Sequence, residues 1–546
     1  MCLLSNSDKS NSVEAKSADH LRNAGLGGLF PCGGSQNSAA TALIVDSRRY
    51  TYGELEVTAR RWATRLAQLT PGGPKRIGIF AYRSFTTYAG VLATTFAGGT
   101  FVPLNPRFPA ERTRDVVRQA DLGAIIVDLA SLPRLSIVLD GLPAGLPVLL
   151  TDGPRTAARF PITLDSNDLE QAFPEEGQPM VGSTDPAYLL FTSGSTGVPK
   201  GVPVTNGNVL SFMAHNRKRY SFSEADRFTQ TFDHTFDLSI FDMFMAWSSG
   251  GTLCVPSLAQ LRSPTAFVEE HGITVWFSVP SLASILIRQR YLSPNLMPRI
   301  RWSLFCGEAL PQFVAEAWQA AAPGSVVENL YGPTELTICC AAHRWEPRIS
   351  PAQCVNGIVP IGRVYEALSH VVRDQHSQAV TPGDVGELWI AGPQTFPGYW
   401  RADHLTADRI VEVSDSSGKT QHYYRTGDLV RQLPSGEYGY VGRMDTQIKI
   451  NGYRVELGEI EAVLRQSGCS EAVALPWPDR NKTKAIIAFV TPDRPIREIS
   501  AFARSRLPTY MVPRRIEPVD VFPLNVNGKT DRGALGQLAT AWRFRA

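Results

Sequence analysis

The sequence predicts an α/β protein with a large N-terminal domain of α/β subdomains plus a small β unit, followed by a small, mobile α+β C-terminal domain. Three observations support this prediction. Short apolar runs alternate with helical stretches through most of the chain. Near residue 360 the sequence changes to aromatic, strand-like segments separated by glycine. The length of 546 residues also exceeds what one hydrophobic core usually organises, so two or more domains are expected.

The first α/β part begins with a short strand and an amphipathic helix in RYTYGELEVTARRWATRLAQL. Four apolar runs follow, RIGIFAY, FVPLN, AIIVD and PVLLT, with helical stretches such as TYAGVLATTFAG between them. The pattern resumes in YLLFT, TLCVP, VWFSVP and RWSLFCG. Strands that alternate with helices are typical of a largely parallel sheet.

The later segments GELWIAG, YYRTGDLV and EYGYVGR read as hairpins of a smaller β unit. Beyond them, AVALPW and AIIAFV predict strands, and EISAFARSRL predicts a helix. We therefore divide the chain into a flexible N-terminal tail (1–20), a large domain (21–444) and a small C-terminal domain (445–546). The joint is short, so relative motion would be a hinge at a few residues.

Composition excludes several classes of function. The net charge is only +3 and the basic residues are scattered, which argues against nucleic-acid binding. No apolar run is long enough to span a membrane. The eight cysteines show no CxxC or other metal-binding spacing, so reduced thiols in a cytoplasmic protein are expected.

The segment TSGSTGVPKG, residues 192–201, has the residue types of a phosphate-binding turn. A Walker loop needs GxxxxGK[ST] leading into a helix. Here Gly194 and Gly197 are too close, Gly201 stands at the hydroxyl position, and KGVPVT predicts a strand. The alternative is a turn between two strands whose hydroxyl and N–H groups surround phosphate oxygens.

The whole string TSGSTGVPKG resembles the signature of adenylate-forming enzymes, which include acyl-CoA ligases, luciferases and the adenylation domains of nonribosomal peptide synthesis. Further strings match in the usual order: YTYGEL, FVPLNPRFPAER, FDLSIFDMF, NLYGPTE, GELWIAGPQTFPGYW, YRTGDL, GYVGRMDTQIKINGYRVELGEIE, LPTYMVP and NVNGKTDR. They span roughly residues 50 to 532. The resemblance implies an ATP-dependent reaction in which a carboxylate forms an acyl-adenylate and a thiol then displaces AMP.

The resemblance also implies roles for individual residues. Tyr331 would stack on adenine, Asn329 would hydrogen-bond its edge, and Asp428 would accept the ribose hydroxyls, with Arg443 nearby. Thr334 would touch the α-phosphate and Glu335 would help to hold Mg²⁺. The β- and γ-phosphates would lie against Thr192, Ser193, Gly194, Ser195, Thr196, Gly197 and Lys200, with Gly307 and Gly332 also beside the nucleotide.

Two lysines of the small domain would serve different half-reactions. By resemblance, Lys529 would bridge the substrate carboxylate and the α-phosphate, although an exposed lysine near the end of a chain is ordinarily only solvated. Asp445 would be the hinge. Rotation there would withdraw Lys529 and bring Lys449 and Gly452 beside the incoming thiol. The expected catalytic residues are thus Lys529, Thr192, Glu335 and Lys449.

Asp237 in FDLSIFDMF bears on the acid that is activated. It precedes a helical stretch, so a helix N-cap worth about 1 kcal/mol is one interpretation. Members of the superfamily that activate amino acids use an Asp here for the α-ammonium, and Phe236 would lie beside it. The implied pocket is otherwise apolar or weakly polar, comprising Asp237, Leu238, Phe241, Ser278, Leu304, Cys306, Leu330, Ile338 and Cys339.

Without a second charge, the pocket favours a small neutral amino acid: proline or alanine first, then glycine or serine. Few residues follow Lys529 and no carrier-type serine motif accompanies them, so we expect transfer to the phosphopantetheine of a separate carrier protein. Two alternatives stay open. One is an acyl-CoA or aryl-acid ligase of the same fold; the other is a catalytically silent nucleotide-binding protein.

Overall fold

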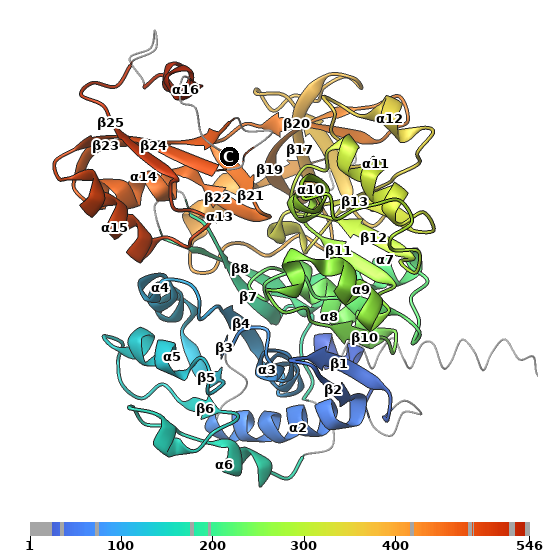
Figure 1. Ribbon diagram of the computed structural model, residues 1–546, viewed down its shortest axis with the longest axis vertical. Coiled ribbons are helices and arrows are strands. Elements are labelled where there is room, and N and C mark those ends of the chain that lie inside the picture. Colours follow the sequence, from blue (N-terminus) through green and yellow to red (C-terminus); the bar gives the residue numbers. More distant parts are fainter. Residues whose placement is uncertain are drawn as a thin grey trace, which may run out of the picture.

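A computed structural model describes residues 24–32, 38–70, 76–174, 179–194, 198–414, 420–478, 483, 485–523 and 530–540. Two large, mostly parallel sheets dominate its N-terminal part (Figure 1). The nine-stranded sheet has the order β15 (Arg363–Val364), β14 (Ala341–Arg344), β13 (Val326–Tyr331), β12 (Trp302–Phe305), β11 (Val275–Ser278), β9 (Arg227–Thr229), β10 (Thr252–Cys254), β1 (Thr41–Val45) and β2 (Arg48–Thr51). The six-stranded sheet has the order β6 (Val148–Leu150), β5 (Leu122–Val127), β3 (Arg76–Phe80), β4 (Thr100–Leu104), β7 (Pro186–Thr192) and β8 (Lys200–Thr205).

The main hydrophobic core lies between these two sheets. It combines their facing side chains with those of four helices, α2 (Tyr52–Leu69), α3 (Phe85–Phe96), α7 (Asn206–Arg219) and α8 (Leu238–Ser248). Helices α4 (Ala110–Ala120) and α5 (Leu132–Leu139) cover the outer face of the six-stranded sheet. Helices α9 (Pro264–His271), α10 (Pro280–Arg288) and α11 (Gln312–Ala321) cover the outer face of the other. The predicted α/β alternation is confirmed.

Local sequence explains where these elements begin. The hydroxyl of Thr51 accepts the N–H of Glu54, whose carboxylate accepts the N–H of Thr51 at 2.7 Å. This capping box starts α2 directly after β2. Between β7 and β8 the chain reverses, and Thr192 pairs with Lys200. The two strands predicted on either side of the turn are therefore present, and α7 begins only after β8.

The β unit after residue 360 is a five-stranded antiparallel sheet. It contains β16 (Ser369–Arg373), β17 (Val385–Ala391), β19 (Thr420–Gln432), β18 (Ile410–Ser414) and β20 (Tyr438–Arg443), with α13 (Asp403–Arg409) before β18. In the ladder between β19 and β20, Asp428 stands opposite Arg443. The sheet thus places a carboxylate and a guanidinium side by side.

The C-terminal part has the predicted α+β character. Its sheet is formed by β23 (Cys469–Trp477), β24 (Ala485–Pro492) and β25 (Arg515–Pro518). Helices α14 (Leu457–Gln466) and α15 (Ile496–Arg506) share one core with it, and α16 (Arg532–Thr540) belongs to a second, smaller core. Ahead of this sheet, β21 (Gln447–Ile450) and β22 (Tyr453–Glu456) form a separate hairpin.

The hairpin turn is Asn451-Gly452, with φ of +51° and +81°. Two central residues with positive φ are typical of a type I′ turn, for which Asn-Gly is the preferred dipeptide because glycine and asparagine tolerate this backbone. The hairpin is thus defined by its local sequence. Among the described residues, no helix is both long and apolar enough to cross a membrane.

Candidate active site

The site lies where the ends of several strands of both large sheets meet the β21–β22 hairpin. The turn after β7, the ends of β12 and β13, the start of α8 and the β19–β20 ladder all contribute side chains. The hairpin reaches the site from the C-terminal part (Figure 1). Ligands of α/β proteins commonly bind outside the carboxyl ends of parallel strands.

Three residues expected near a nucleoside lie together. The hydroxyl of Tyr331 donates to Asp428 Oδ2 at 2.6 Å, and Arg443 Nη1 donates to Asp428 Oδ1 at 2.6 Å. All three side chains are almost fully buried. Asp428 is therefore held in one orientation beside the Tyr331 ring.

Asn329 has an unused acceptor. Its amide nitrogen donates to the carbonyl of Pro360 at 2.8 Å, whereas its buried Oδ1 has no partner among the described residues. Buried polar atoms are normally hydrogen-bonded, so an orphaned oxygen indicates a ligand donor. An exocyclic amine such as that of adenine fits this position.

Glu335 is the most constrained carboxylate of the site. It lies in the short helix η4 (Thr334–Leu336), is fully buried, and accepts from the Tyr399 hydroxyl at 2.7 Å. Arg454 Nη1 contacts both of its oxygens at 2.7 and 2.9 Å, and Lys200 Nζ lies 3.6 Å away. Burial alone would raise the pKa of Glu335, but the charges of Arg454 and Lys200 outweigh it and hold the pKa well below its usual range.

The guanidinium of Arg454 has spare donors. Its Nε and Nη2 are buried and have no acceptor among the described residues, and the same holds for the hydroxyl of Thr192. Lys200 is also buried, and burial followed by the nearby charge of Arg454 lowers its pKa to about 8. This concentration of unpaired donors and positive charge suits a phosphate.

The phosphate-binding turn is described only in part. Ser193 accepts the N–H of Glu456 at 3.2 Å and donates to the carbonyl of Arg454 at 2.8 Å, so it is bonded to the hairpin. At Gly194 the backbone passes close to its own turn, since a Cβ there would come within 2.1 Å of the carbonyl oxygen of Val198. Ser195, Thr196 and Gly197 lie outside the described residues.

The tip of the hairpin is seated in the large domain. The N–H of Gly452 donates to Glu308 Oε1 at 2.7 Å, and the N–H of Ser281 donates to the other oxygen at 2.9 Å. A Cβ on Gly452 would come within 2.3 Å of Val279. Gly307 faces the Cα of Gly452, since a Cβ on Gly307 would come within 3.8 Å of it. Only glycine therefore fits at position 452, at the tip of the hairpin.

Asp237 lies at the first turn of α8, is 6% exposed, and makes no side-chain capping bond. One of its oxygens, Oδ2, has no partner among the described residues. Burial raises the pKa of Asp237 to about 7, although the Thr334 hydroxyl and the Ile338 N–H lower it in part. Asp237 therefore does not cap the helix with a side-chain hydrogen bond, and its free Oδ2 indicates a cationic ligand.

The predicted pocket side chains belong mostly to one buried cluster. That cluster contains Leu238, Phe241, Leu304, Cys306, Leu330, Ile338 and Cys339. Phe236 packs edge-on against Tyr453 of the hairpin, with ring centroids 4.6 Å apart. Gly332 permits the close approach of the chain at Cys339, because a Cβ would come within 2.4 Å of the Cys339 Cα.

Ser278 is the last residue of β11 and is fully buried. Its hydroxyl accepts the indole N–H of Trp276 at 2.9 Å, and Trp276 belongs to the core on the outer face of the sheet. Its neighbour Phe277 belongs to the main core, and the Phe277 ring lies 5.1 Å from that of Phe241. The pocket role of Ser278 stays a prediction.

The predicted residues of the small domain fall in different places. Asp445 accepts from Arg443 Nε at 2.7 Å and from Arg409 at 3.2 Å. These arginines outweigh the effect of burial and hold its pKa well below the usual range. Lys449 pairs with Arg454 across the hairpin, and its charge acts on the thiols of Cys306 and Cys340. Lys529 lies outside the described residues.

Several residues of the site were not predicted from the sequence, namely Arg454, Glu308, Tyr399, Phe277 and the buried ion pair Arg112–Glu459 between α4 and α14. Arg454 stands in the quoted string NGYRVELGEIE, where an arginine among apolar residues is a signal for a buried charge. Glu308 in CGEALP carries a weaker signal. The other contacts join segments too distant in sequence to be recognised.

The fold and this constellation define a class: a two-part α/β protein whose buried polar site lies between the two large sheets and the β21–β22 hairpin of the C-terminal part. The family of AMP-binding enzymes matches residues 34–400, and the AMP-binding enzyme C-terminal domain matches residues 459–529. The chain belongs to this family. It is an adenylate-forming enzyme of the nonribosomal peptide synthetase adenylation type, an AMP-forming ligase that uses ATP.

Similar proteins cover nearly the whole chain. An L-proline–[L-prolyl-carrier protein] ligase of Streptomyces coelicolor is 34% identical over 520 residues, which are 92% of this chain and 94% of that protein. A dimodular nonribosomal peptide synthase of Bacillus subtilis is 33% identical over 90% of this chain, which spans only 20% of that larger protein. The Vibrio cholerae adenylation domain AlmE, solved with glycyl-adenosine-5′-phosphate, is 29% identical with a TM-score of 0.80 and 99% coverage of both chains. IdnL7 is 38% identical with a TM-score of 0.71, over 95% of this chain and 99% of that one.

Proposed function

We propose that this enzyme activates a small neutral amino acid as its aminoacyl-adenylate and transfers it to the phosphopantetheine thiol of a separate carrier protein. The observation that carries the proposal is Asp237, a buried carboxylate with one oxygen that has no partner among the described residues, in a predicted pocket that is otherwise apolar or weakly polar. An isolated buried charge is costly unless it is paired. The α-ammonium of an amino acid supplies that pair, whereas a fatty or aryl acid does not.

The close packing of the predicted pocket residues supports a small side chain. Phe241 packs against Phe212, Phe277 and Tyr220, with ring centroids 5.1 to 6.1 Å apart. Cys339 is held by the Tyr365 hydroxyl at 3.1 Å. No second ionic side chain was predicted for this pocket, so a neutral substrate is favoured. Proline and alanine fit best, with glycine and serine next, and a difference of one methylene discriminates by only about 1–3 kcal/mol.

The relatives support the same substrate class. The Streptomyces coelicolor relative is named for proline and its carrier protein, and AlmE was solved with a glycyl-adenylate. Both substrates are small neutral amino acids. Because the proline ligase matches nearly over its full length, a carrier protein is the favoured acceptor here as well.

For the first half-reaction, we infer that Asn329, Tyr331, Asp428 and Arg443 hold the adenosine part of ATP. Lys200, Thr192 and the following turn would hold the leaving pyrophosphate, and Thr334 would approach the α-phosphate. Glu335 is an oxygen ligand of the kind Mg²⁺ prefers. In the present arrangement Arg454 neutralises Glu335. A magnesium ion would therefore fit Glu335 once the hairpin withdraws, with Asp445 as the hinge and Lys529 entering as the catalytic lysine.

The arrangement seen here suits the second half-reaction. The hairpin brings Lys449, Gly452 and Arg454 to the site, and it contacts Ser193 and Glu335, the residues that we expect beside the β- and γ-phosphates and Mg²⁺. Pyrophosphate must therefore leave before the hairpin is seated. The spare donors of Arg454 are then available to the phosphate of the leaving AMP.

The decisive experiment is amino-acid-dependent ATP–pyrophosphate exchange with a panel of the common amino acids. We expect exchange with one small neutral amino acid, proline or alanine first. Exchange with only an aryl or fatty acid would instead support an acyl-CoA or aryl-acid ligase. No exchange with any acid, together with retained ATP binding, would favour a catalytically silent nucleotide-binding protein.

The substitution Lys529→Ala tests whether the small domain takes up a different orientation for each half-reaction. We expect a strong loss of adenylate formation, while transfer from a supplied aminoacyl-adenylate stays largely intact. An equal loss of both half-reactions would contradict alternation at the Asp445 hinge.

A further inference from the structure

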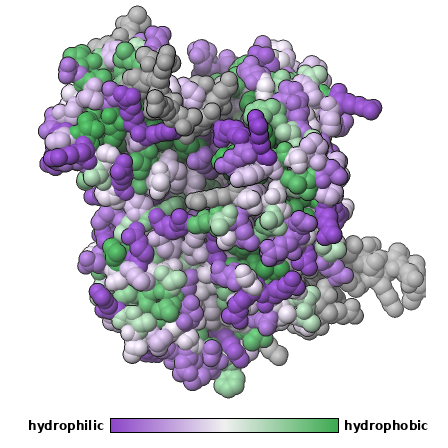
Figure 2. Space-filling model, viewed as in Figure 1, coloured by the Kyte–Doolittle hydropathy of each residue, from purple (hydrophilic) through white to green (hydrophobic). Residues whose placement is uncertain are grey.

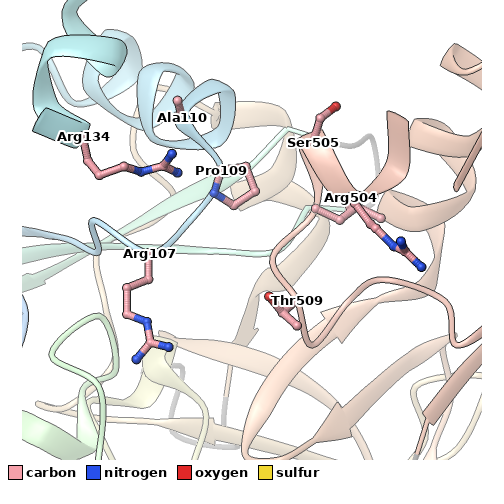
Figure 3. A pocket seen from close by; sticks show the side chains of 8 residues that line it. Arg107, Pro109, Ala110, Arg134, Arg504, Ser505 and Thr509 are labelled. Atoms are coloured by element: carbon pink, nitrogen blue, oxygen red, sulfur yellow. The ribbon is translucent and has the colours of Figure 1, made fainter. Parts of the chain in front are cut away.

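Two features outside the active site lack the geometry of a second binding site. A cavity of about 380 Å³ lies between α4 and α15, but the guanidinium groups of Arg107 and Arg504 that line it point away from each other and do not converge on one ligand (Figure 3). On the face drawn in Figure 2, hydrophobic residues form several small groups among hydrophilic ones. The more unusual geometry lies inside the protein, at a turn beside the predicted amino-acid pocket.

This turn, from Leu336 to Cys339, has a strained backbone. Thr337 and Ile338 have φ of +59° and +70°, in the left-handed region. Both side chains are branched at Cβ, and such residues rarely adopt this conformation because the side chain crowds the backbone. Backbone strain persists only where the surrounding structure holds the chain, and it is concentrated at functional sites. The neighbours of the turn must therefore hold it in this conformation.

Gln394 provides three of the contacts that hold the turn. Its amide nitrogen donates to the carbonyls of Leu336 at 3.1 Å and of Cys339 at 2.9 Å, the two ends of the turn. Its backbone carbonyl accepts the hydroxyl of Thr337 at 2.6 Å. Gln394 is only 1% exposed, so water has little access to these bonds. A single buried residue thus closes the turn from both ends.

The position of Gln394 is fixed in turn by the start of α7. Asn208 Nδ2 donates to the carbonyls of Pro393 at 2.8 Å and of Thr395 at 3.0 Å, on either side of Gln394. Asn208 belongs to the capping box of α7, in which its Oδ1 accepts the N–H of Thr205 at 3.0 Å. The strained turn is therefore connected through Gln394 to a helix of the main core.

Tyr365 holds the end of the turn. Its N–H donates to the carbonyl of Cys340 at 2.9 Å, and its hydroxyl lies 3.1 Å from Cys339 Sγ. The buried ring stacks on His215 of α7 with centroids 3.8 Å apart, and the hydroxyl also donates to Asn216 Oδ1 at 3.5 Å. The Tyr365 ring therefore limits how far the Cys339 side chain can retreat.

The turn meets the predicted amino-acid pocket at two points. The N–H of Ile338 faces the Asp237 carboxylate and lowers its pKa in part. The side chains of Ile338 and Cys339 are predicted to line the space for the side chain of the substrate. Under the proposed function, the position of the turn would therefore affect both the contact with the ammonium group and the room beside it.

We propose that Gln394 and Tyr365 determine which amino acid the enzyme accepts, although neither is predicted to touch the substrate. They act as positioning residues. Gln394 holds Ile338 beside Asp237, and Tyr365 holds Cys339 at the wall of the side-chain pocket. The inference rests on the proposed activation of a small neutral amino acid and names the residues that limit its size.

The first test measures ATP–pyrophosphate exchange with two amino acids, the best substrate of the panel and its homologue with one more methylene. With the native enzyme we expect kcat/KM to be at least about ten-fold lower for the homologue. Tyr365→Leu removes the hydroxyl and part of the ring volume behind Cys339, so the two amino acids should become about equal substrates. Tyr365→Phe keeps the ring and should keep most of the discrimination.

The second test is Gln394→Leu, which removes both amide donors and keeps a similar volume. The KM for every amino acid that is used should rise about ten-fold as the turn relaxes, while the KM for ATP stays unchanged. Adding Thr337→Gly should recover part of this loss, because glycine adopts positive φ without strain. If Gln394 served stability alone, a second substitution in the core would lower the activity further, and that result would overturn its positioning role.

Tyr52→Leu is the matched control for the loss of a buried tyrosine. Tyr52 is buried at the start of α2, and its hydroxyl donates to the carbonyl of Gly251 at 2.7 Å. Its midpoint of thermal unfolding should fall, while its discrimination between the two amino acids stays that of the native enzyme. Unchanged discrimination in Tyr365→Leu, or an equal change in Tyr52→Leu, would overturn the role of Tyr365. Failure of the native enzyme to exchange with every amino acid would instead reject the proposed function.

Discussion

Arg454 and Glu335, 119 positions apart in the sequence, form a largely buried ion pair in which Arg454 Nη1 lies 2.7 and 2.9 Å from the two carboxylate oxygens. The pair joins the hairpin of the small domain to the residue expected to hold magnesium. Under the proposed function, Glu335 would have two alternative cationic partners, Arg454 in the seated arrangement and the magnesium ion of the nucleotide complex.

Replacing Arg454 with Gln should affect the two half-reactions differently. The variant leaves Glu335 buried without its arginine, which costs about 3–5 kcal/mol in the seated arrangement. We expect transfer from a preformed adenylate to slow by roughly 100-fold or more, with pyrophosphate exchange retained. Single-turnover transfer and exchange measure the two steps separately. Equal losses would show that Arg454 serves both.

Replacing Gly452 with Ala should prevent the hairpin from seating. The added Cβ would come within 2.3 Å of Val279, and φ of +81° strains any side chain other than hydrogen. Transfer should fall below detection while adenylation continues. The double variant G452A/V279A removes the clash but keeps the strain, so partial recovery is expected. Full transfer activity of G452A alone would show that the hairpin does not have to pack against Val279 during transfer.

Asp237→Asn should stabilise the empty enzyme while it abolishes amino-acid-dependent exchange. The pKa of Asp237 is raised to about 7, so the folded state binds more protons than the unfolded state between about pH 4 and 7. The free energy of unfolding therefore falls as the pH rises through that range, by up to about 4 kcal/mol. Thermal melting at pH 8 should show a higher midpoint for the variant than for the native protein. A lower midpoint would contradict the buried, unpaired carboxylate.

The Asp237 carboxyl also predicts how the binding of the amino acid depends on pH. Below pH 7 the empty pocket holds a protonated Asp237, which cannot pair with an ammonium. The KM for the amino acid should therefore rise about ten-fold per pH unit below 7, while the KM for ATP does not follow it. Initial rates of exchange between pH 5.5 and 8 check this, and a flat profile would contradict it.

Lys200 predicts a second pH effect, which concerns the binding of ATP above pH 8. Its pKa is lowered to about 8, so the lysine is largely neutral above that pH and the seated arrangement becomes more stable as the pH rises. A neutral lysine holds phosphate poorly, so the KM for ATP should increase above pH 8. Lys200→Arg keeps its charge and should flatten this increase. Identical profiles for both enzymes would show that another group titrates.

The sequence predicted the architecture well because most elements are locally encoded. The capping box at Thr51, the Asn451-Gly452 turn and the alternation of β3 to β6 with helices require no distant contact. The predicted partners around Asp428 also lie together, since Arg443 is its ladder neighbour. These features depend on neighbours in sequence or in adjacent strands.

The remaining features depend on contacts between distant segments. The hydrogen bond between Trp276 and Ser278 and the packing of Phe277 against Phe241 depend on which face of β11 each side chain takes, and the sequence alone does not specify that face. Glu308 belongs to the site only because the hairpin of the small domain rests against it. Arg454 belongs to the site only because the same hairpin carries it there. The domain orientation itself is not a local property of the chain.

Under the proposed function, Ser193 and Glu335 would each take part in two sets of contacts at different times, because the hairpin binds the same atoms that the polyphosphate and its magnesium ion would use. A substitution at Ser193 or Glu335 would therefore affect both sets of contacts. A change at either position that tightens nucleotide binding should also alter the later transfer step, because the hairpin would then compete with the nucleotide for a modified partner. Nucleotide affinity and transfer rate would therefore not vary independently in this enzyme.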